Sequence, residues 1–326
     1  MRIEKVCVLG GSGFVGSALV YRLDAAGCSV KVLTRRREAS KHLILLPRVD
    51  VVECDIMDDV ALAQEIAGYD AVINLVGILH ESRRATFDAV HVQLPRRLVQ
   101  ICRNNGVRRL LHMSALHANG DAPSAYLRSK GAGEAEVMKE ALLAEPVLLR
   151  HGYQLQVTVF RPSVIFGRGD RFLNLFAKLV RFLPMIALAK PEARFQPVWV
   201  EDIARAFVAS LERVETFGKG YDLCGPRIYT LRELVQLVAD TLGVQRRIVG
   251  LSDRLSAWQA RVLEKLPGKL LTRDNLASMQ VDSVCNAGFP RVLNIEPAIL
   301  ETVLPDYLAD RTTRHTYNRY RGRAGR

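Results

Sequence analysis

Short apolar runs alternate with longer stretches of mixed polarity through the first half of the chain. The runs are rich in β-branched residues, which is typical of buried parallel strands, and the stretches between them have helical periodicity. The expected strands are Lys5 to Leu9, Ser29 to Leu33, Val49 to Cys54, Ala71 to Leu75, Arg109 to Met113 and Gln156 to Phe160. This alternation predicts parallel βαβ units and therefore an α/β fold, a doubly wound Rossmann parallel sheet.

Helical patterns fill the intervals and continue into the second half. The expected helices are Ser17 to Ala26, Thr86 to Asn105, Ala122 to His151, an aromatic-rich basic segment from Phe172 to Leu188 with a break at Pro184, Leu231 to Leu242, Leu255 to Leu266 and Val303 to Leu308. The pattern changes after Arg161-Pro162, where a glycine-containing loop follows.

This change of pattern suggests a division into domains. We expect residues 1–162 to form a dinucleotide-binding domain, with a late strand near 220–224 returning to it. Residues 163–310 are expected to form mainly a smaller C-terminal substrate domain, and residues 311–326 a basic disordered tail. The length of 326 residues is sufficient for this arrangement.

A glycine-rich loop lies between the first strand and the first helix. Its residues are Gly10, Gly11, Ser12, Gly13, Phe14, Val15 and Gly16. Three of the glycines suit a tight turn, the close approach of a pyrophosphate and the packing of helix on strand. The helix N-terminus offers N–H groups to phosphates. The loop therefore predicts a dinucleotide site, and its G-x-x-G-x-x-G spacing favours the short-chain dehydrogenase/reductase variant.

The end of the second strand indicates which dinucleotide is bound. Rossmann folds that bind NAD place an acidic residue there, on the ribose 2′-OH. This chain has Thr34-Arg35-Arg36-Arg37 instead. A guanidinium pairs with the 2′-phosphate of NADP, so NADP(H) is preferred over NAD(H), with Arg35 as the first candidate, Arg36 beside it and Thr34 as a supporting donor.

Other strand ends are expected to complete the cofactor site. Asp55 and Ile56 would meet the adenine, and Leu75, Val76 and Gly77 would pass the nicotinamide ribose. Pro162 and Val164, after the sixth strand, are also expected at the cofactor.

A tyrosine and a lysine supply the candidate chemistry. Tyr126 and Lys130 are four residues apart in an expected helix and therefore lie on one face. We expect the lysine, together with a cationic nicotinamide, to favour the phenolate, so that Tyr126 acts as an acid/base near neutral pH. Lys130 would also hold the ribose hydroxyls. Ser114 is the third candidate, either as a donor to the substrate carbonyl or as a serine that caps its own backbone.

These motifs together resemble the extended short-chain dehydrogenase/reductases. The resemblance rests on the glycine loop, 109–114, the Tyr126-x-x-x-Lys130 pair, 161–167 and 196–204, in that order. Residues 114–116, 124–134 and 271–276 are similar to the atypical branch that contains the alpha-subcomplex subunit nine family of respiratory complex I and its free-standing bacterial relatives. The resemblance implies a tightly held NADP(H) and, for the bacterial relatives, an epimerase, dehydratase or reductase activity.

Two departures from that family pattern affect the catalytic site. Ala115 stands where extended enzymes have a second Ser or Thr, and the loop from Ser114 to Tyr126 is short. Ser124 or His117 could replace the missing donor. The leading hypothesis is an oxidoreductase or epimerase-like enzyme on an unidentified carbonyl or hydroxyl substrate. The alternative is an NADP(H)-binding accessory or assembly protein of the respiratory chain or of quinone metabolism, with little or no turnover.

The sequence says less about the substrate. Aromatic and basic residues between 166 and 199 fit either an apolar pocket with an anion site or a packed core. The candidate residues are Phe166, Phe172, Phe176, Phe182, Met185, Phe195, Trp199, Arg168, Arg171 and Arg194.

Composition and charge add expectations about location and partners. The chain is 49% hydrophobic and 25% charged, and no apolar stretch reaches the roughly 20 residues that span a bilayer. The first strand begins near residue 4, which predicts a cytoplasmic protein without a leader. Six cysteines are scattered singly, so we expect buried thiols rather than a disulfide or a metal site.

The basic tail is the remaining feature. The formal charge is +12, and residues 311–326 carry six arginines and no acid. The tail is either a solvated segment or a contact for an anionic membrane surface or an acidic protein. Contact with a membrane surface would place the protein peripherally at the inner face of the membrane. No specific nucleic acid is expected. A membrane role would also use the amphipathic stretch from Leu255 to Leu271.

Overall fold

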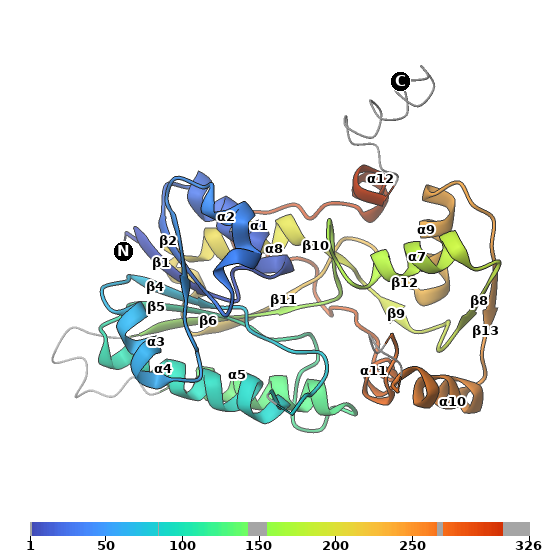
Figure 1. Ribbon diagram of the computed structural model, residues 1–326, viewed down its shortest axis with the longest axis horizontal. Coiled ribbons are helices and arrows are strands. Elements are labelled where there is room, and N and C mark those ends of the chain that lie inside the picture. The colour runs from blue at the N-terminus through green and yellow to red at the C-terminus, as the bar shows by residue number, and fades with distance from the viewer. Residues whose placement is uncertain (1, 84, 143–154, 266–269, 309–326) are drawn as a thin grey trace, which may run out of the picture. The chain divides into compact units, whose positions relative to one another are not determined.

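The computed structural model describes residues 2–83, 85–142, 155–265 and 270–308 (Figure 1). The chain divides into two compact units. Unit 1 contains Met1–Pro162, Val200–Leu223 and Phe289–Ile295. Unit 2 contains Ser163–Trp199, Cys224–Gly288 and the described residues from Glu296 onward. Residues 200–210, which the sequence analysis assigned to the smaller domain, are therefore part of unit 1.

Unit 1 is built on a parallel sheet. In the described residues its strand order is β11-β6-β5-β4-β1-β2-β3. The strands are β1 (Lys5–Leu9), β2 (Ser29–Thr34), β3 (Val49–Glu53), β4 (Ala71–Asn74), β5 (Arg109–Met113), β6 (Gln156–Pro162) and β11 (Lys219–Leu223). The order reverses between β1 and β4, and such a switch point creates a crevice at the carboxyl ends of the strands. The expected Rossmann fold and the late returning strand are confirmed.

Helices cover both faces of this sheet (Figure 1). One face carries α1 (Phe14–Ala25), α2 (Lys41–Ile44) and α8 (Val200–Ser210), and the other carries α3 (Asp59–Ile66), α4 (Leu94–Asn104) and α5 (Ala125–Leu142). The strands are buried on both faces, with Val6, Val8 and Leu9 fully shielded from solvent, which explains their continuous apolar runs.

A buried arginine joins the last part of the sheet to α8. Arg109 on β5 donates hydrogen bonds to Thr158 Oγ1 at 2.7 Å, Thr216 Oγ1 at 2.9 Å and the Ser210 carbonyl at 2.8 Å. Burial lowers the pKa of Arg109 to about 9. The guanidinium therefore serves as a hydrogen-bonding centre for three separate segments of unit 1.

Several helix boundaries differ from the expected ones. Residues 86–105 do not form one helix, because a π-helical turn at Asp88–Gln93 precedes α4. Helix α5 begins at Ala125 rather than Ala122. The part of that expected helix from residue 143 to His151, and the basic tail, lie outside the described residues.

Unit 2 packs short strands against helices around its own apolar core. Its helices are α7 (Leu173–Phe182), α9 (Leu231–Thr241), α10 (Asp253–Leu263), α11 (Arg273–Ser278) and α12 (Leu300–Leu308). Its strands are β7 (Ile165–Phe166), β8 (Met185–Leu188), β9 (Arg194–Phe195), β10 (Val198–Trp199), β12 (Tyr229–Thr230) and β13 (Arg247–Gly250). The expectation of a helix after Pro184 is wrong, because residues 185–188 form β8 in parallel pairing with β13.

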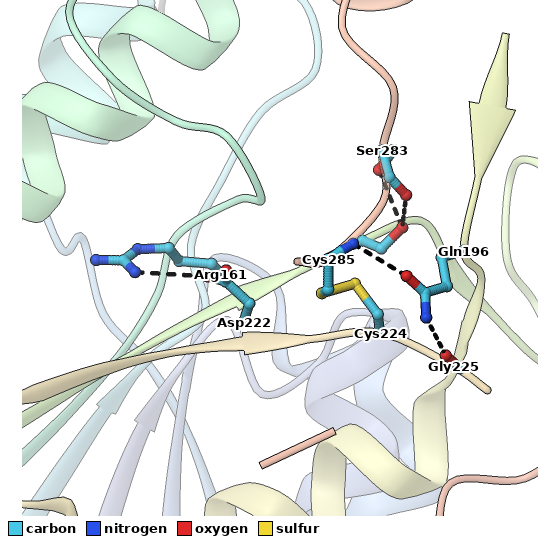
Figure 2. The surroundings of a disulfide bond; sticks show 8 residues. Arg161, Gln196, Asp222, Cys224, Gly225, Ser283 and Cys285 are labelled. Carbon is cyan, nitrogen blue, oxygen red and sulfur yellow. Dashed lines mark hydrogen bonds and ion pairs between the residues drawn. A yellow bond between two sulfur atoms is a disulfide. The ribbon is translucent and has the colours of Figure 1, made fainter. Parts of the chain in front are cut away.

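A disulfide in unit 2 shows that the expectation of six free, buried thiols is wrong. Cys224 and Cys285 are bonded to each other (Figure 2). Gln196 holds both segments in place, since its Oε1 accepts from the Cys285 N–H at 3.0 Å and its Nε2 donates to the Gly225 carbonyl at 2.7 Å. The cysteines are 61 residues apart, so no local spacing in the sequence indicated the pair.

Candidate functional site

The glycine loop is held between β1, β4 and the first turn of α1. Gly10 has a φ of +80°, and a Cβ on it would lie 3.2 Å from the backbone of Leu75 and Val76. A Cβ on Gly16 would lie 2.2 Å from the Gly10 carbonyl oxygen. Gly13, at the N-terminus of α1, provides no capping side chain. The first N–H groups of α1 are therefore available to an anion, as a dinucleotide pyrophosphate requires.

The end of β2 lies beside the glycine loop. Ser12 Oγ and Thr34 Oγ1 are 3.3 Å apart, and Thr34 Oγ1 accepts from the Arg36 N–H at 3.3 Å. Arg35 and Arg36 are exposed. Arg37 is engaged elsewhere, because its Nε donates to the Val51 carbonyl at 3.0 Å. Two of the three arginines thus have side chains in solvent next to the loop.

The remaining predicted cofactor residues are placed as follows. Asp55 follows β3 and is exposed, with one oxygen accepting from the Met57 N–H at 3.0 Å, and Ile56 packs against the apolar core. Pro162 ends β6 and its carbonyl accepts from the Leu116 N–H. Val164 belongs to unit 2. The structure therefore gathers the glycine loop with the ends of β2 and β4.

Helix α5 carries Tyr126 and Lys130. Ser124 Oγ accepts from the Leu127 N–H at 3.2 Å at the start of this helix, which leaves the O–H of that hydroxyl as a donor. Close packing sets the position of α5. A Cβ on Gly133 would lie only 1.7 Å from the carbonyl oxygen of His91, in the π-helical turn before α4.

His91 connects this helix to the segment after β4. Its Nε2 accepts from the Ile78 N–H at 3.0 Å, and its Nδ1 lies 2.8 Å from Ser129 Oγ. Burial lowers the pKa of His91 to about 3, so the ring is neutral. Because Nε2 accepts, Nδ1 carries the proton and donates to Ser129, whose hydroxyl donates to the Tyr126 carbonyl at 2.8 Å.

The same histidine contacts the candidate catalytic ring. Tyr126 packs edge-on against His91, with ring centroids 5.6 Å apart, and against Phe87 at 6.1 Å. Sequence reasoning missed His91 and Ser129. Their partners are 13 and 38 residues away, and only the closeness of Ser129 to Lys130 in the sequence could have drawn attention to one of them.

Burial shifts the two candidate catalytic groups in opposite directions. It raises the pKa of Tyr126 to about 12 and lowers the pKa of Lys130 to about 8. The expectation that the lysine favours the phenolate is therefore not met by the protein's own groups, because the desolvation cost of the phenolate dominates. Glu134, one turn further along α5, opposes the shift at Lys130.

Two buried polar groups at the end of β5 fit a ligand. Lys130 Nζ donates to the Met113 carbonyl at 2.6 Å, and this is the only hydrogen bond of that ammonium within the described residues, which leaves two donors. Ser114 is 3% exposed, and among the same residues its Oγ has no partner. Its hydroxyl therefore does not cap its own backbone. Both groups therefore keep donors that acceptors on a bound ligand would satisfy.

The aromatic segment from 166 to 199 divides into core and surface. Phe166, Phe176 and Phe195 are buried in the core of unit 2, and Phe172 and Trp199 pack against it. Phe182 and Met185 are exposed, as are the three arginines Arg168, Arg171 and Arg194. Most of these aromatic side chains therefore belong to the hydrophobic core of unit 2 or pack against it.

Comparisons with known proteins agree with this architecture. Residues 6–224 match the NAD dependent epimerase/dehydratase family. The chain is 33% identical to the NADH dehydrogenase (ubiquinone) 1 alpha subcomplex subunit 9 of Arabidopsis thaliana, over 75% of this chain and 59% of that protein. It is 30% identical to a ceramide reductase of Caulobacter vibrioides, over 76% of this chain and 74% of that one. The chain thus spans about three-fifths of the Arabidopsis relative.

Solved structures share the fold. One is MoeE5, solved in complex with UDP-glucose and NAD, with a TM-score of 0.70 over 96% of this chain and 100% of that one at 18% identity. In the described residues no helix is long and apolar enough to cross a membrane.

Proposed function

The chain belongs to the NAD dependent epimerase/dehydratase family, and on that basis we propose that it is an NADP(H)-dependent oxidoreductase acting on a carbonyl or hydroxyl group. The observation that carries the proposal is the pair of buried donors at the end of β5, Lys130 Nζ and Ser114 Oγ, whose hydrogen-bonding capacity the described residues leave unused. Buried donors of this kind are costly unless a ligand satisfies them.

Each residue has a role that its position supports. A bound nicotinamide supplies hydride exchange at its C4. Lys130 holds the ribose hydroxyls with its two remaining donors, Ser114 donates to the substrate oxygen, and Tyr126 exchanges a proton with that oxygen. His91 acts as a positioning residue, because it fixes the Tyr126 backbone through Ser129 and the segment after Gly77 through the Ile78 N–H.

The residues at the end of β2 support the proposed preference for NADP(H). Arg35 and Arg36 are exposed there, and no carboxylate occupies the positions between Thr34 and Arg37. A charge-assisted hydrogen bond from guanidinium to phosphate is worth about 1.5–3 kcal/mol, which corresponds to roughly 10- to 100-fold in affinity.

The test compares NADPH and NADH binding by ligand fluorescence in matched variants. Arg35→Ala should weaken NADPH binding about 10-fold or more and leave NADH binding unchanged. Arg37→Ala is the control, since the Arg37 side chain is bound to the Val51 carbonyl, and it should leave the NADPH/NADH ratio as in the wild type. Equal affinities of the wild type for both dinucleotides would refute the preference.

The catalytic part needs a separate readout. Loss of NADPH absorbance would be followed with carbonyl substrates related to the classes that the relatives' names indicate, a keto lipid and a nucleotide-linked keto sugar. Tyr126→Phe should abolish turnover while NADPH still binds, because the phenol hydroxyl exchanges the proton but does not hold the cofactor. Full activity in Tyr126→Phe would exclude the acid/base role.

A second candidate is an accessory protein in which NADP(H) stabilises the fold. The likeness to a complex I subunit favours it, as does Ala115 at the end of β5. In that case NADPH at 100 times its Kd would stabilise the protein by about 2.7 kcal/mol, and a cellular phenotype would depend on Arg35 but not on the Tyr126 hydroxyl. A phenotype that depends on the Tyr126 hydroxyl as well as on Arg35 would support the enzyme.

A further inference from the structure

One helix of unit 2 presents an apolar stripe to solvent. On α10, Leu255 is 54% exposed, Trp258 65% and Val262 40%. They are spaced by three and four residues, so at 3.6 residues per turn they share one side of the helix. The opposite side is buried through Ser256 and Ala260. The outward side of an anchored helix thus carries the large apolar residues that normally face a core.

Three cations border this stripe. Arg254 and Arg261 are exposed and seven residues apart on α10, which places them on one side of the helix beside the apolar side chains. The exposed Lys265 follows in the turn after the helix ends at Leu263. The acidic residues of the same segment are neutralised, since Asp253 pairs with Lys190 at 2.7 Å and Glu264 pairs with Arg273 at 2.8 Å. Within the described residues, Arg254, Arg261 and Lys265 form no ion pair. We call these three cations and the three apolar residues the α10 face.

The helix is fixed to unit 2 on its other side. Gln259 Nε2 donates to the Ala187 carbonyl on β8 at 3.0 Å, and the Lys190–Asp253 ion pair ties down its first turn. Leu270, 46% exposed, follows shortly before α11. The α10 face is therefore a stable part of the surface.

We propose that the α10 face docks on an anionic lipid surface, with α10 lying in the plane of the membrane interface. An amphipathic helix with Trp and Leu on its apolar side and basic residues beside them binds in this way. The tryptophan suits the interface, where its ring is buried and its N–H stays hydrated. The proposal is independent of the cofactor site.

The dimensions and the charge favour lipid over the other occupants. Eleven helical residues extend about 16 Å, and with a helix width of about 10 Å the stripe covers roughly 160 Å². This area is much smaller than the roughly 800 Å² that each partner buries in a stable protein interface. A second copy of this face would place three cations against three. The chain's own end carries six arginines between residues 311 and 326, so the same repulsion opposes it as a cover.

Sedimentation with vesicles tests the proposal. The full-length protein is mixed with vesicles of phosphatidylcholine alone and with vesicles that contain 30% phosphatidylglycerol, at about 0.1 M and about 1 M salt. We expect binding to the anionic vesicles at low salt, and much weaker binding to the neutral vesicles and at high salt, where the screening length falls from about 10 Å to about 3 Å.

Fluorescence reports which residue enters the lipid. The chain has two tryptophans, Trp199 and Trp258, so Trp199→Phe leaves Trp258 as the sole reporter. Its emission should shift to the blue when the anionic vesicles are added. An unchanged emission spectrum of bound protein would overturn the proposal.

Matched variants separate the α10 face from other surfaces. Arg254→Gln/Arg261→Gln/Lys265→Gln should weaken partitioning roughly 100-fold, at about fivefold per cation. Lys178→Gln/Lys219→Gln/Arg291→Gln removes the same charge from exposed positions elsewhere and should have a much smaller effect. Leu255→Gln/Trp258→Gln/Val262→Gln, which also removes the fluorescent reporter, should abolish sedimentation with the anionic vesicles, with Leu45→Gln/Val60→Gln/Val214→Gln as its exposed control.

Other results would overturn the proposal. One is equal binding of the α10 variants and their controls. A second is loss of binding only when the six arginines of residues 311–326 are replaced by glutamine in the full-length chain. A third is a wild-type dimer in sedimentation velocity that becomes monomeric in the Leu255/Trp258/Val262 variant, which would assign the α10 face to a second copy.

Discussion

Replacement of His91 by glutamine should change how the stability of the protein depends on pH. The ring is 1% exposed, and burial lowers its pKa from the ordinary 6.5 to about 3. Between these two values the unfolded chain binds a proton that the folded protein does not. The free energy of unfolding therefore falls as the pH drops from about 7 toward 3, and the contribution of His91 is fully present only above pH 6.5.

The size of the effect follows from the shift. One pKa unit corresponds to about 1.36 kcal/mol, so at pH 5, which is 1.5 units below 6.5, His91 should lower the free energy of unfolding by about 2 kcal/mol. Glutamine keeps the hydrogen bonds, because its Oε1 can accept from the Ile78 N–H and its Nε2 can donate to Ser129, but it does not titrate. The variant should lose some stability at every pH and lack this part of the acid sensitivity.

Urea unfolding at pH 7, 6 and 5 gives the comparison. The free energy of the wild type should fall by about 2 kcal/mol more than that of His91→Gln between pH 7 and pH 5. His42→Gln is the control, since that exposed imidazole stays hydrated and carries no burial cost. An identical pH dependence in wild type and His91→Gln would refute the argument that the ring is buried in its neutral form.

Three further predictions concern packing and covalent structure. Gly133→Ala should destabilise the protein by several kcal/mol in urea, because the new Cβ would meet the His91 carbonyl oxygen, whereas Gly120→Ala, with open space around it, should have little effect. Arg109→Met should cost at least about 3 kcal/mol in the same assay, because the carbonyl and hydroxyl acceptors around it lose their donor. Thiol titration of the denatured protein should find four free thiols before reduction and six after it, and Cys224→Ser should lower the free energy of unfolding by about 4 kcal/mol for a 61-residue separation. Six thiols without reduction would show that the disulfide does not form.

Local patterns explain why most of unit 1 could be predicted. The glycine loop and the buried strands depend on residues close in sequence, so β1, β5 and the returning β11 were expected nearly where they lie. The segment after Pro184 shows the limit. Met185 and Ala187 are exposed while Ile186 and Leu188 are buried, which is the alternation of a strand, but its partner β13 begins about 60 residues later and is not visible locally.

Long-range contacts account for what the sequence left out of the candidate site. The π-helical turn places His91 against Ser129, 38 residues further along, and Gly133 makes room for that approach. The Cys224–Cys285 pair depends in the same way on Gln196, which holds both segments. Residue types alone do not reveal such distant partners. The spacing of Tyr126 and Lys130 along one helix, by contrast, was sufficient to identify these two residues as candidates for the site.

The protonation states at the proposed site favour one direction of reaction. Burial raises the pKa of Tyr126 to about 12 and lowers that of Lys130 to about 8, so near neutral pH the phenol keeps its proton and most of the lysine is an ammonium. The spacing of Tyr126 and Lys130 places them on one face of the helix, but desolvation sets their protonation states. In the proposed function, a protonated phenol and the Ser114 hydroxyl, which has no partner among the described residues, would both donate to the substrate oxygen. Such a site stabilises the negative charge that develops on a carbonyl during reduction, whereas oxidation of an alcohol would first require the costly buried phenolate. If the proposed function holds, reduction of a carbonyl is therefore the direction in which Tyr126 can assist without first losing its proton.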